Sequence, residues 1–187
     1  MQQSFDLFFV SSNNHKYQEA KHILHSSGIR LGFFKYELEE IQSDSLKKIA
    51  SKKVQYAFQK YKKPVLIEDD GLFIDSLYGF PGPYSSYVFK TIGNKGILQL
   101  LKQNRKAQFV SIISFCDDKN SKSFEAKVDG SISKTQNGKG WGYDPIFMLK
   151  NLNKTFAELT NKNELSHRYK ALKKFSNWYL HKLKSND

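Results

Sequence analysis

The sequence predicts an α/β domain with a mixed central sheet flanked by helices. Its first half alternates apolar, strand-like runs with segments whose apolar residues recur every three or four positions. Its second half contains two long strand-like runs, Ala107–Cys116 and Ser123–Ser133, which a polar loop separates as in a hairpin. Strand–helix units combined with a long hairpin indicate a mixed sheet.

The first strand is expected at Phe5–Val10, where apolar residues dominate. The small polar residues 11–14 favour a turn and a helix N-cap, and a helix from about His15 to Ser27 should end at Gly28. A second and more regular helix is expected at Ser45–Tyr61. Ser43 or Asp44 would cap it.

A buried strand is expected at Val65–Ile67, and Gly71 is interpreted as the turn that ends it. Three acids, Glu68, Asp69 and Asp70, then lie at the carboxyl end of that strand, where α/β enzymes build their sites. Because side chains alternate along a strand, Glu68 and Asp70 should share one face and Asp69 should point to the other.

The rest of the chain is expected to be irregular over residues 72–87, which contain several Gly and Pro residues. A short helix around residues 95–103, a strand at 145–149 and a final helix from about 166 to 183 complete the predicted elements. We find no repeat and no linker, so residues 1–187 are expected to form one domain.

The composition restricts the class of protein. The single cysteine, Cys116, fits a reducing compartment, and no apolar stretch approaches the roughly 20 residues that span a bilayer. We therefore expect a cytoplasmic protein without a membrane partner. The net charge is +12, with +3 in residues 1–100 and +9 in residues 101–187. Such a surface attracts polyanions, which leaves nucleic acid, an acidic membrane face and small phosphorylated substrates open.

The acidic triplet requires a compensating positive charge. A divalent metal is the obvious candidate, because magnesium binds a few carboxylates and completes its shell with waters and substrate phosphates. Glu40, which has no capping role, would supply a further ligand. The alternative is a solvated turn whose acids only cap neighbouring amides.

Two further segments carry polar residues suited to a nucleotide. Residues 11–16 join a strand to a helix and would offer amides, hydroxyls and Lys16 to a phosphate, although, taken alone, an ordinary N-cap explains them better. Residues 140–145, with Trp141 between glycines, offer a stacking surface, and His167 and Arg168 offer donors to a base or phosphate. The alternatives are a core tryptophan and an exposed helix start.

Together these segments resemble the inosine triphosphate pyrophosphatase family, and in residues 83–96 its archaeal branch. Ser11-x-Asn13-x-x-Lys16 is similar to the family's Thr-x-Asn-x-x-Lys. Residues 68–72 are similar to Asp-Asp-Ser-Gly-Leu, and residues 79–85 to Gly-x-Pro-Gly-x-Tyr-Ser. Residues 141–145 resemble Phe-Gly-Tyr-Asp-Pro, and residues 166–168 match Ser-His-Arg.

The resemblance implies two lobes with an active-site cleft between them, and magnesium-dependent hydrolysis of inosine and xanthosine triphosphates and their deoxy forms to monophosphate and pyrophosphate. It implies that Asp69 is the catalytic base and a metal ligand, and that Glu40 is the other metal ligand. The substrate-binding residues that it implies are Ser11, Asn13, Lys16, Lys53, Asp70, Trp141, Gly142, Tyr143, Asp144, Lys162, His167 and Arg168.

Three residues depart from the family pattern: Ser11 replaces Thr, Trp141 replaces Phe, and Asp70 replaces Ser. Asp70 matters most, because an extra carboxylate repels a triphosphate unless it binds metal. The resemblance also suggests a homodimer. Two alternatives stay open: a pyrophosphatase for pyrimidine or modified nucleotides, and a basic RNA-binding protein, although we expect no stable nucleic-acid partner.

Overall fold

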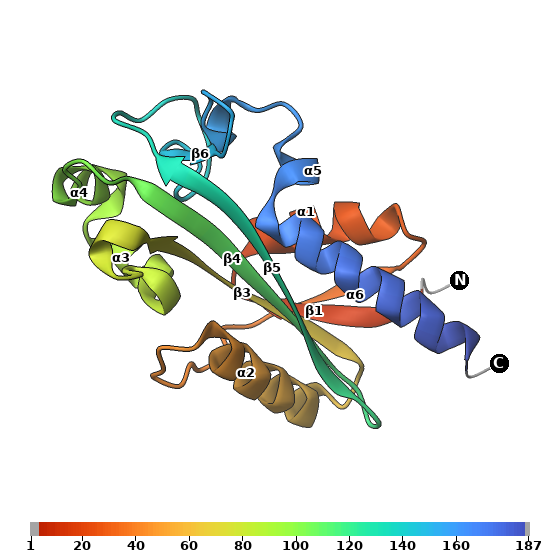
Figure 1. Ribbon diagram of the computed structural model, residues 1–187. Coiled ribbons are helices and arrows are strands. Elements are labelled where there is room, and N and C mark those ends of the chain that lie inside the picture. The colour runs from red at the N-terminus through yellow and green to blue at the C-terminus, as the bar shows by residue number, and fades with distance from the viewer. Residues whose placement is uncertain (1–3, 186–187) are drawn as a thin grey trace. The chain divides into compact units, whose positions relative to one another are not determined.

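The computed structural model describes residues 4–185, and within this range six strands form one sheet in the order β2-β1-β3-β4-β5-β6 (Figure 1). β1 pairs in parallel with β2 and β3, whereas β5 and β6 are antiparallel, which confirms the predicted mixed sheet. The strands are β1 (Leu7–Ser11), β2 (Leu31–Lys35), β3 (Val65–Ile74), β4 (Lys106–Cys116), β5 (Ser121–Ile132) and β6 (Phe147–Leu149).

Six α-helices and three short 3-10 helices accompany these strands in the described range. The α-helices are α1 (Asn14–His25), α2 (Leu46–Tyr61), α3 (Ser85–Thr91), α4 (Gly93–Leu100), α5 (Lys162–Leu165) and α6 (His167–Lys184), and the 3-10 helices are Asp75–Leu77, Gly82–Tyr84 and Phe156–Glu158. Of all these helices, none is both long and apolar enough to pass through a membrane. Residues 72–87, expected to be irregular, contain the end of β3, two 3-10 helices and the start of α3.

The described chain divides into two compact units. Unit 1 consists of residues 4–69, 111–126 and 168–185, and unit 2 of Asp70–Val110 and Lys127–His167. Strands β3, β4 and β5 each contribute residues to both units.

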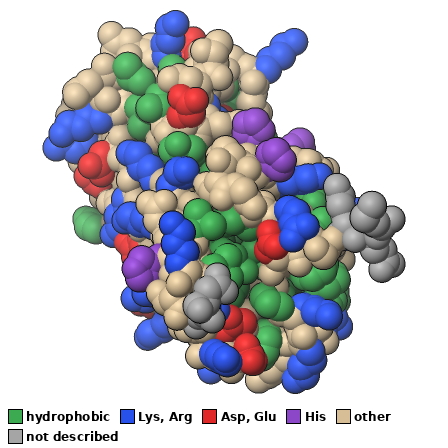
Figure 2. Space-filling model, turned by 90° about the vertical axis from the view of Figure 1, so that its right-hand side faces the viewer, with side chains coloured by type: hydrophobic (Ala, Val, Ile, Leu, Met, Phe, Trp, Pro, Cys, Tyr) green, Lys and Arg blue, Asp and Glu red, His purple; other side chains and the backbone are tan. Residues whose placement is uncertain are grey.

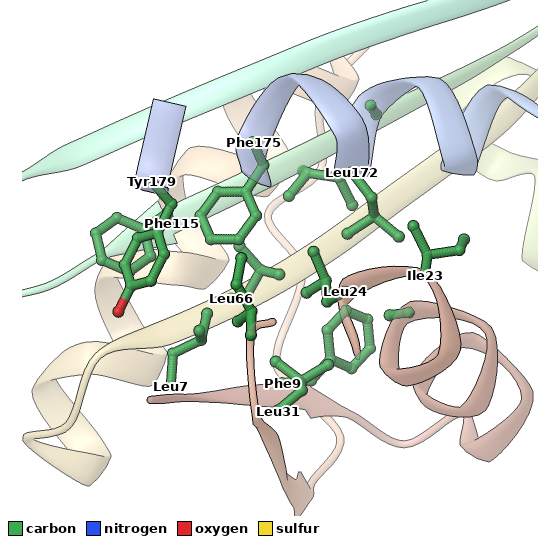
Figure 3. Close-up of a cluster of buried hydrophobic side chains, with 14 of the residues drawn as sticks. Leu7, Phe9, Ile23, Leu24, Leu31, Leu66, Phe115, Leu172, Phe175 and Tyr179 are labelled. Carbon is green, nitrogen blue, oxygen red and sulfur yellow. The ribbon is translucent and has the colours of Figure 1, made fainter. Parts of the chain in front are cut away.

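Helices α1 and α6 cover one face of the strands in unit 1. Figure 3 shows Leu24 of α1 and Phe175 of α6 pointing toward the strand residues, among them Leu66 of β3. These three side chains are fully buried, so the apolar face of each helix is held by the sheet rather than by helix propensity alone. Figure 1 shows α2 on the opposite face of the same strands, and its Ala50, Val54 and Ala57 are buried.

The helix starts follow the local capping chemistry. The Asn13 carboxamide accepts hydrogen bonds from the amides of His15 and Lys16 and caps α1. For α2, Ser43 or Asp44 was the expected cap, but the cap is Ser45, whose hydroxyl accepts from the amide of Lys48. The Ser43 hydroxyl instead accepts from the amide of Ser45 and so fixes the residue before the helix.

The interpretation of Gly71 as a turn that ends the strand is wrong. β3 continues through Gly71 to Ile74. A Cβ atom at Gly71 would lie 2.5 Å from the carbonyl oxygen of Gly82, which belongs to the same unit. Glycine is therefore required here for the close approach of another backbone segment, and the solvated-turn alternative for the acidic triplet is excluded.

The core of unit 2 forms around Phe109 of β4. Its ring packs at 4.7 Å from that of Phe147 in β6 and parallel to that of Phe156, and Leu72 and Ile74 of β3 belong to the same cluster. The second half of β3 is thus buried like the first, which explains why the strand does not stop at the glycine.

Replacing Gly71 by alanine should lower the free energy of unfolding by about 1–3 kcal/mol, because the methyl group would displace the backbone at Gly82. The midpoint of urea unfolding would measure this loss. Ser86→Ala, at an exposed residue nearby, should change the midpoint little. Equal midpoints for wild type and Gly71→Ala would contradict the close approach.

Candidate active site

Glu68 and Asp69 leave opposite faces of β3. Glu68 accepts a hydrogen bond from Arg168 of α6, whereas Asp69 accepts one from Lys53 of α2. Since α6 and α2 cover opposite faces of the strands in unit 1, the predicted alternation is confirmed for these two acids. Two consecutive carboxylates are therefore placed in different environments, each with its own cation.

The first group of site residues surrounds Lys53. Its Nζ atom lies 2.6 Å from Glu40 Oε1 and 2.6 Å from Asp69 Oδ1. The side chains of Lys53 and Asp69 are only 11% and 9% exposed, whereas that of Glu40 is 54% exposed. An almost buried ammonium group thus bridges the two carboxylates that the family resemblance implies as magnesium ligands.

Asp69 combines a perturbed pKa with an oxygen that has no partner. Burial raises the pKa of its carboxyl above the ordinary value, and the ammonium groups of Lys53 and Lys16 oppose that rise only in part. Among the described residues, no hydrogen-bond partner reaches the buried Oδ2 atom. Buried carboxylate oxygens are normally satisfied, so this atom is available to a water molecule or a metal ion.

These residues fit a magnesium ion that also uses waters and substrate phosphates. Residues 4–185 contain no cluster of three His, Cys, Asp or Glu side chains able to hold a metal by themselves. Magnesium does not need one, because it commonly takes one or two carboxylates and completes its octahedron with other oxygens. Glu40 and Asp69, with the unsatisfied Oδ2 atom, meet that requirement.

Glu68 belongs to a different arrangement, in which its carboxylate is fully buried. Its Oε1 accepts from the Ser111 hydroxyl at 2.8 Å and its Oε2 from Arg168 Nε at 2.6 Å. Arg168 Nη1 also pairs with Glu19 of α1, and Lys16 Nζ lies 3.9 Å from Glu68 Oε2. Arg168, expected to contact the nucleotide, thus joins β3, α1 and α6 inside unit 1. It is buried, so the exposed-helix-start alternative is wrong.

Hydrogen bonds from backbone amides to the side chains of Ser11 and Asn13 fix the segment before α1. The Ser11 hydroxyl accepts from the amide of Asn13, and Asn13 in turn caps the helix. The two residues expected to contact phosphates therefore also fix the loop that presents the first amides of α1 and the Lys16 side chain. A helix N-terminus of this kind attracts anions.

The second group of site residues lies in unit 2, around Trp141–Asp144. Lys162 Nζ of α5 is 2.6 Å from Asp144 Oδ2, and the buried Tyr143 hydroxyl donates to the carbonyl of Ser85 at 2.8 Å. Burial raises the pKa of Tyr143, so its hydroxyl stays protonated. Trp141 is 44% exposed, which contradicts the alternative of a core tryptophan and leaves part of its indole accessible for stacking.

His167 of unit 2 is buried against an aromatic ring. It stacks on Phe109 with ring centroids 4.5 Å apart and planes 6° from parallel. Within the described part of the chain, neither ring nitrogen has a hydrogen-bond partner, and the nearest carboxylate oxygen is Asp70 Oδ2, 3.8 Å from Nε2. The imidazole is thus held in position by packing while its polar atoms remain available.

Sequence reasoning missed Asn94 of α4. Its Nδ2 donates to the carbonyl of Gly142 at 3.0 Å, so it fixes the backbone beside Trp141, while its buried Oδ1 has no partner among residues 4–185. Glu19 and Ser111 were missed as well. A polar residue at a helix start or inside a strand gives no local signal that it supports a distant segment.

Replacing Arg168 by methionine should lower the free energy of unfolding by about 3–5 kcal/mol, because Glu68 would remain as a buried charge without its closest cation. Chemical denaturation would measure the loss. Lys170→Met, at an exposed position on the same helix, is the matched control. Adding Glu68→Gln to Arg168→Met should recover part of the stability. A single variant as stable as the control would contradict the buried pair.

Comparison with known proteins places these features in a family. The sequence model of the protein family described as the Ham1 family matches residues 7–178 of this chain. A protein named dITP/XTP pyrophosphatase from Methanopyrus kandleri is 45% identical over 179 residues, which cover 92% of this chain and 95% of the relative. A protein of the same name from Thermococcus kodakarensis is 42% identical over 183 residues, which cover 95% of this chain and 99% of the relative.

Solved structures agree with the sequence comparison. The structure of a HAM1 protein from Coxiella burnetii matches with a TM-score of 0.82 and 25% identity, covering 95% of this chain and all of that one. The structure of the Staphylococcus aureus Ham1 protein matches with a TM-score of 0.76 and 28% identity, covering 94% of this chain and 99% of that one. The agreement of sequence and fold over nearly the whole length shows that this chain belongs to the Ham1 family.

Proposed function

We propose that the protein is a magnesium-dependent pyrophosphatase that hydrolyses inosine and xanthosine triphosphates and their deoxy forms to the monophosphate and pyrophosphate. The observation that carries this proposal is Asp69, a buried carboxylate with a raised pKa, one unsatisfied oxygen and a second acid nearby. The names of the archaeal relatives, which align along almost the whole chain, support it.

Asp69 acts as the general base in this proposal. Its Oδ2 accepts a proton from a water molecule, whose oxygen forms a bond to phosphorus in line with the departing pyrophosphate while the bond to the bridging oxygen breaks. The raised pKa suits this role, because a stronger base removes the proton more readily. Magnesium, held by Glu40 and Asp69, would neutralise charge on the phosphate oxygens.

The remaining residues of unit 1 receive the phosphates. The N-terminus of α1, capped by Asn13, offers the positive end of the helix dipole to an anion, and Lys16 adds a positive charge in the first turn. Lys53 adds another. These cations stabilise the charge that develops on the pyrophosphate leaving group.

The residues of unit 2 receive the nucleoside. Trp141 offers its exposed ring for stacking, and Gly142, Tyr143, Asp144 and Lys162 shape the adjoining segment. His167 can donate to the 6-keto oxygen of hypoxanthine or xanthine. Adenine presents an amino group there and would leave the donor unpaired, which rejects it.

A single nucleotide would engage both groups, as a cleft between two lobes requires. The chain passes from one unit to the other between Asp69 and Asp70 and between His167 and Arg168. Arg168 keeps a proposed role in substrate binding, acting mainly through the position that it gives to Glu68. Asp70, near the imidazole of His167, would act on the base side of the substrate rather than on the phosphates.

We further propose a cytoplasmic homodimer without a stable nucleic-acid partner. Exposed aromatic residues in unit 2, Tyr78, Phe80, Tyr84 and Tyr87, are suited to contact with a second copy. On the face drawn in Figure 2, lysine and arginine side chains are spread among acidic, apolar and neutral ones instead of forming a continuous basic stripe, which disfavours the RNA-binding alternative for that face.

Purified protein incubated with magnesium should release pyrophosphate and monophosphate from ITP, dITP and XTP far faster than from ATP or GTP. Product analysis by ion-exchange chromatography would measure both products. Release of orthophosphate alone, or equal turnover of ATP, would reject the proposal. Preferential turnover of UTP or dTTP would favour a pyrophosphatase for pyrimidine nucleotides instead.

Asp69→Asn should lower kcat by at least about 100-fold, since the carboxamide cannot accept the proton from water. The variant should stay folded. Because burial raises the pKa of Asp69, its ionised form costs the folded state stability at neutral pH, and the neutral amide avoids that cost. Asp75→Asn, at an exposed acid following the same strand, is the matched control and should keep full activity. Comparable kcat values for both variants would remove Asp69 from its role.

A further inference from the structure

Lys53 occupies the point at which the two proposed metal ligands converge. Its ammonium group lies 2.6 Å from one oxygen of Glu40 and 2.6 Å from one oxygen of Asp69. Both are charge-assisted hydrogen bonds of short length, and Lys53 is almost completely shielded from solvent. In this state a cation already compensates both carboxylates, and that cation belongs to the protein.

A metal ion bound by the same two acids would compete with these bonds. A magnesium ion held by both acids takes oxygen ligands at about 2.0–2.1 Å, so it would compete with the ammonium for Glu40 Oε1 and Asp69 Oδ1. If it used the other two oxygens, two cations would stand side by side in a weakly solvated place, which is unfavourable. Metal binding and the lysine pairing therefore oppose each other.

The surroundings let Lys53 move while its helix stays in place. Helix α2 is fixed by the buried Val54 and Ala57 and by the cap at Ser45, and none of these depends on the ammonium group. Lysine carries its charge on a flexible four-carbon stem. Glu40 is half exposed and lies between β2 and α2, in a segment that forms neither strand nor helix.

We propose that Lys53 is an internal placeholder for the metal ion: it closes the metal-free site by bridging Glu40 and Asp69, and metal binding releases it to the substrate phosphates. This inference rests on the metal site of the proposed function. Its consequence is an obligatory coupling, because the lysine becomes a phosphate ligand only once the metal has taken its place. Free nucleotide without metal would meet a lysine whose charge is already neutralised.

The coupling makes opposite predictions for two ligands. In Lys53→Gln the metal no longer displaces a competing cation, so the variant should bind metal alone about tenfold more tightly or better than wild type. The variant also lacks a phosphate contact, so it should bind pyrophosphate in the presence of metal more weakly. A lysine that merely stabilises the fold would not produce these opposite signs.

Isothermal titration of the full chain with Mn²⁺, and then with pyrophosphate at saturating Mn²⁺, would measure both effects without turnover. Two control variants distinguish displacement of the Lys53 ammonium by the metal from a general loss of positive charge near the site. Lys52→Gln removes a charge from an exposed neighbour on α2. Lys16→Gln removes a second charge that acts on Asp69 through space. Both should change the affinity for Mn²⁺ alone much less than Lys53→Gln does.

The wild-type protein provides a second readout if Lys53→Gln does not fold. Brief acetylation followed by peptide mass spectrometry should modify Lys53 several-fold faster with Mg²⁺ than without it, while Lys52 reacts equally in both conditions. Unchanged reactivity of Lys53, or equal Mn²⁺ affinity of wild type and Lys53→Gln, would overturn the placeholder. Failure of both proteins to bind Mn²⁺ even with pyrophosphate would overturn the metal site of the proposed function together with it.

Discussion

The structure of unit 1 depends on the pairing of two adjacent buried carboxylates with cations that come from helices. β3 is buried along nearly its whole length, yet it carries Glu68 and Asp69. A buried carboxylate without a partner would cost several kcal/mol. Because consecutive side chains leave opposite faces of a strand, each acid takes its hydrogen-bonded cation from its own face, Glu68 from Arg168 and Asp69 from Lys53.

Each helix around β3 therefore contributes a positively charged side chain that pairs with one of its acids. On one face, α6 supplies Arg168 and α1 supplies Lys16, and on the other face α2 supplies Lys53. Each of these helices also buries an apolar side against the strands. Apolar packing therefore fixes where the helices lie, and the charged side chains that they direct toward the sheet pair with the acids of β3. The same contacts that satisfy the carboxylates bring the candidate catalytic groups together.

Features determined by local pattern could be predicted from the sequence. The helix at Ser45–Tyr61 follows a helical periodicity, and the two hairpin strands are long strand-like runs separated by a polar loop. All three lie within a few residues of α2, β4 and β5. β2 was missed because Leu31–Lys35 is short, contains a glycine and does not alternate. Its strand conformation comes from parallel pairing with β1, which is a tertiary contact.

The roles of Gly71 and of the ionic partners were harder to infer from the sequence, because they too depend on tertiary contacts. Gly71 has the local signature of a turn, but its requirement for glycine arises from Gly82, eleven residues away. The sequence indicated that Lys53 and Arg168 belong to the site, yet their carboxylate partners are 16 and 100 residues distant. No spacing rule connects residues so far apart.

The hydrogen-bond partners of the two acids explain why only one of them is suited to catalysis. Both oxygens of Glu68 are engaged, one by Ser111 and the other by Arg168, so a proton or a metal ion could reach it only by breaking the network that stabilises unit 1. Asp69 uses one oxygen for Lys53 and leaves the other unsatisfied in a buried position. Such an atom costs stability, and it persists because the surrounding packing holds it. The proposed catalytic role therefore falls to the acid whose hydrogen-bond partners are incomplete.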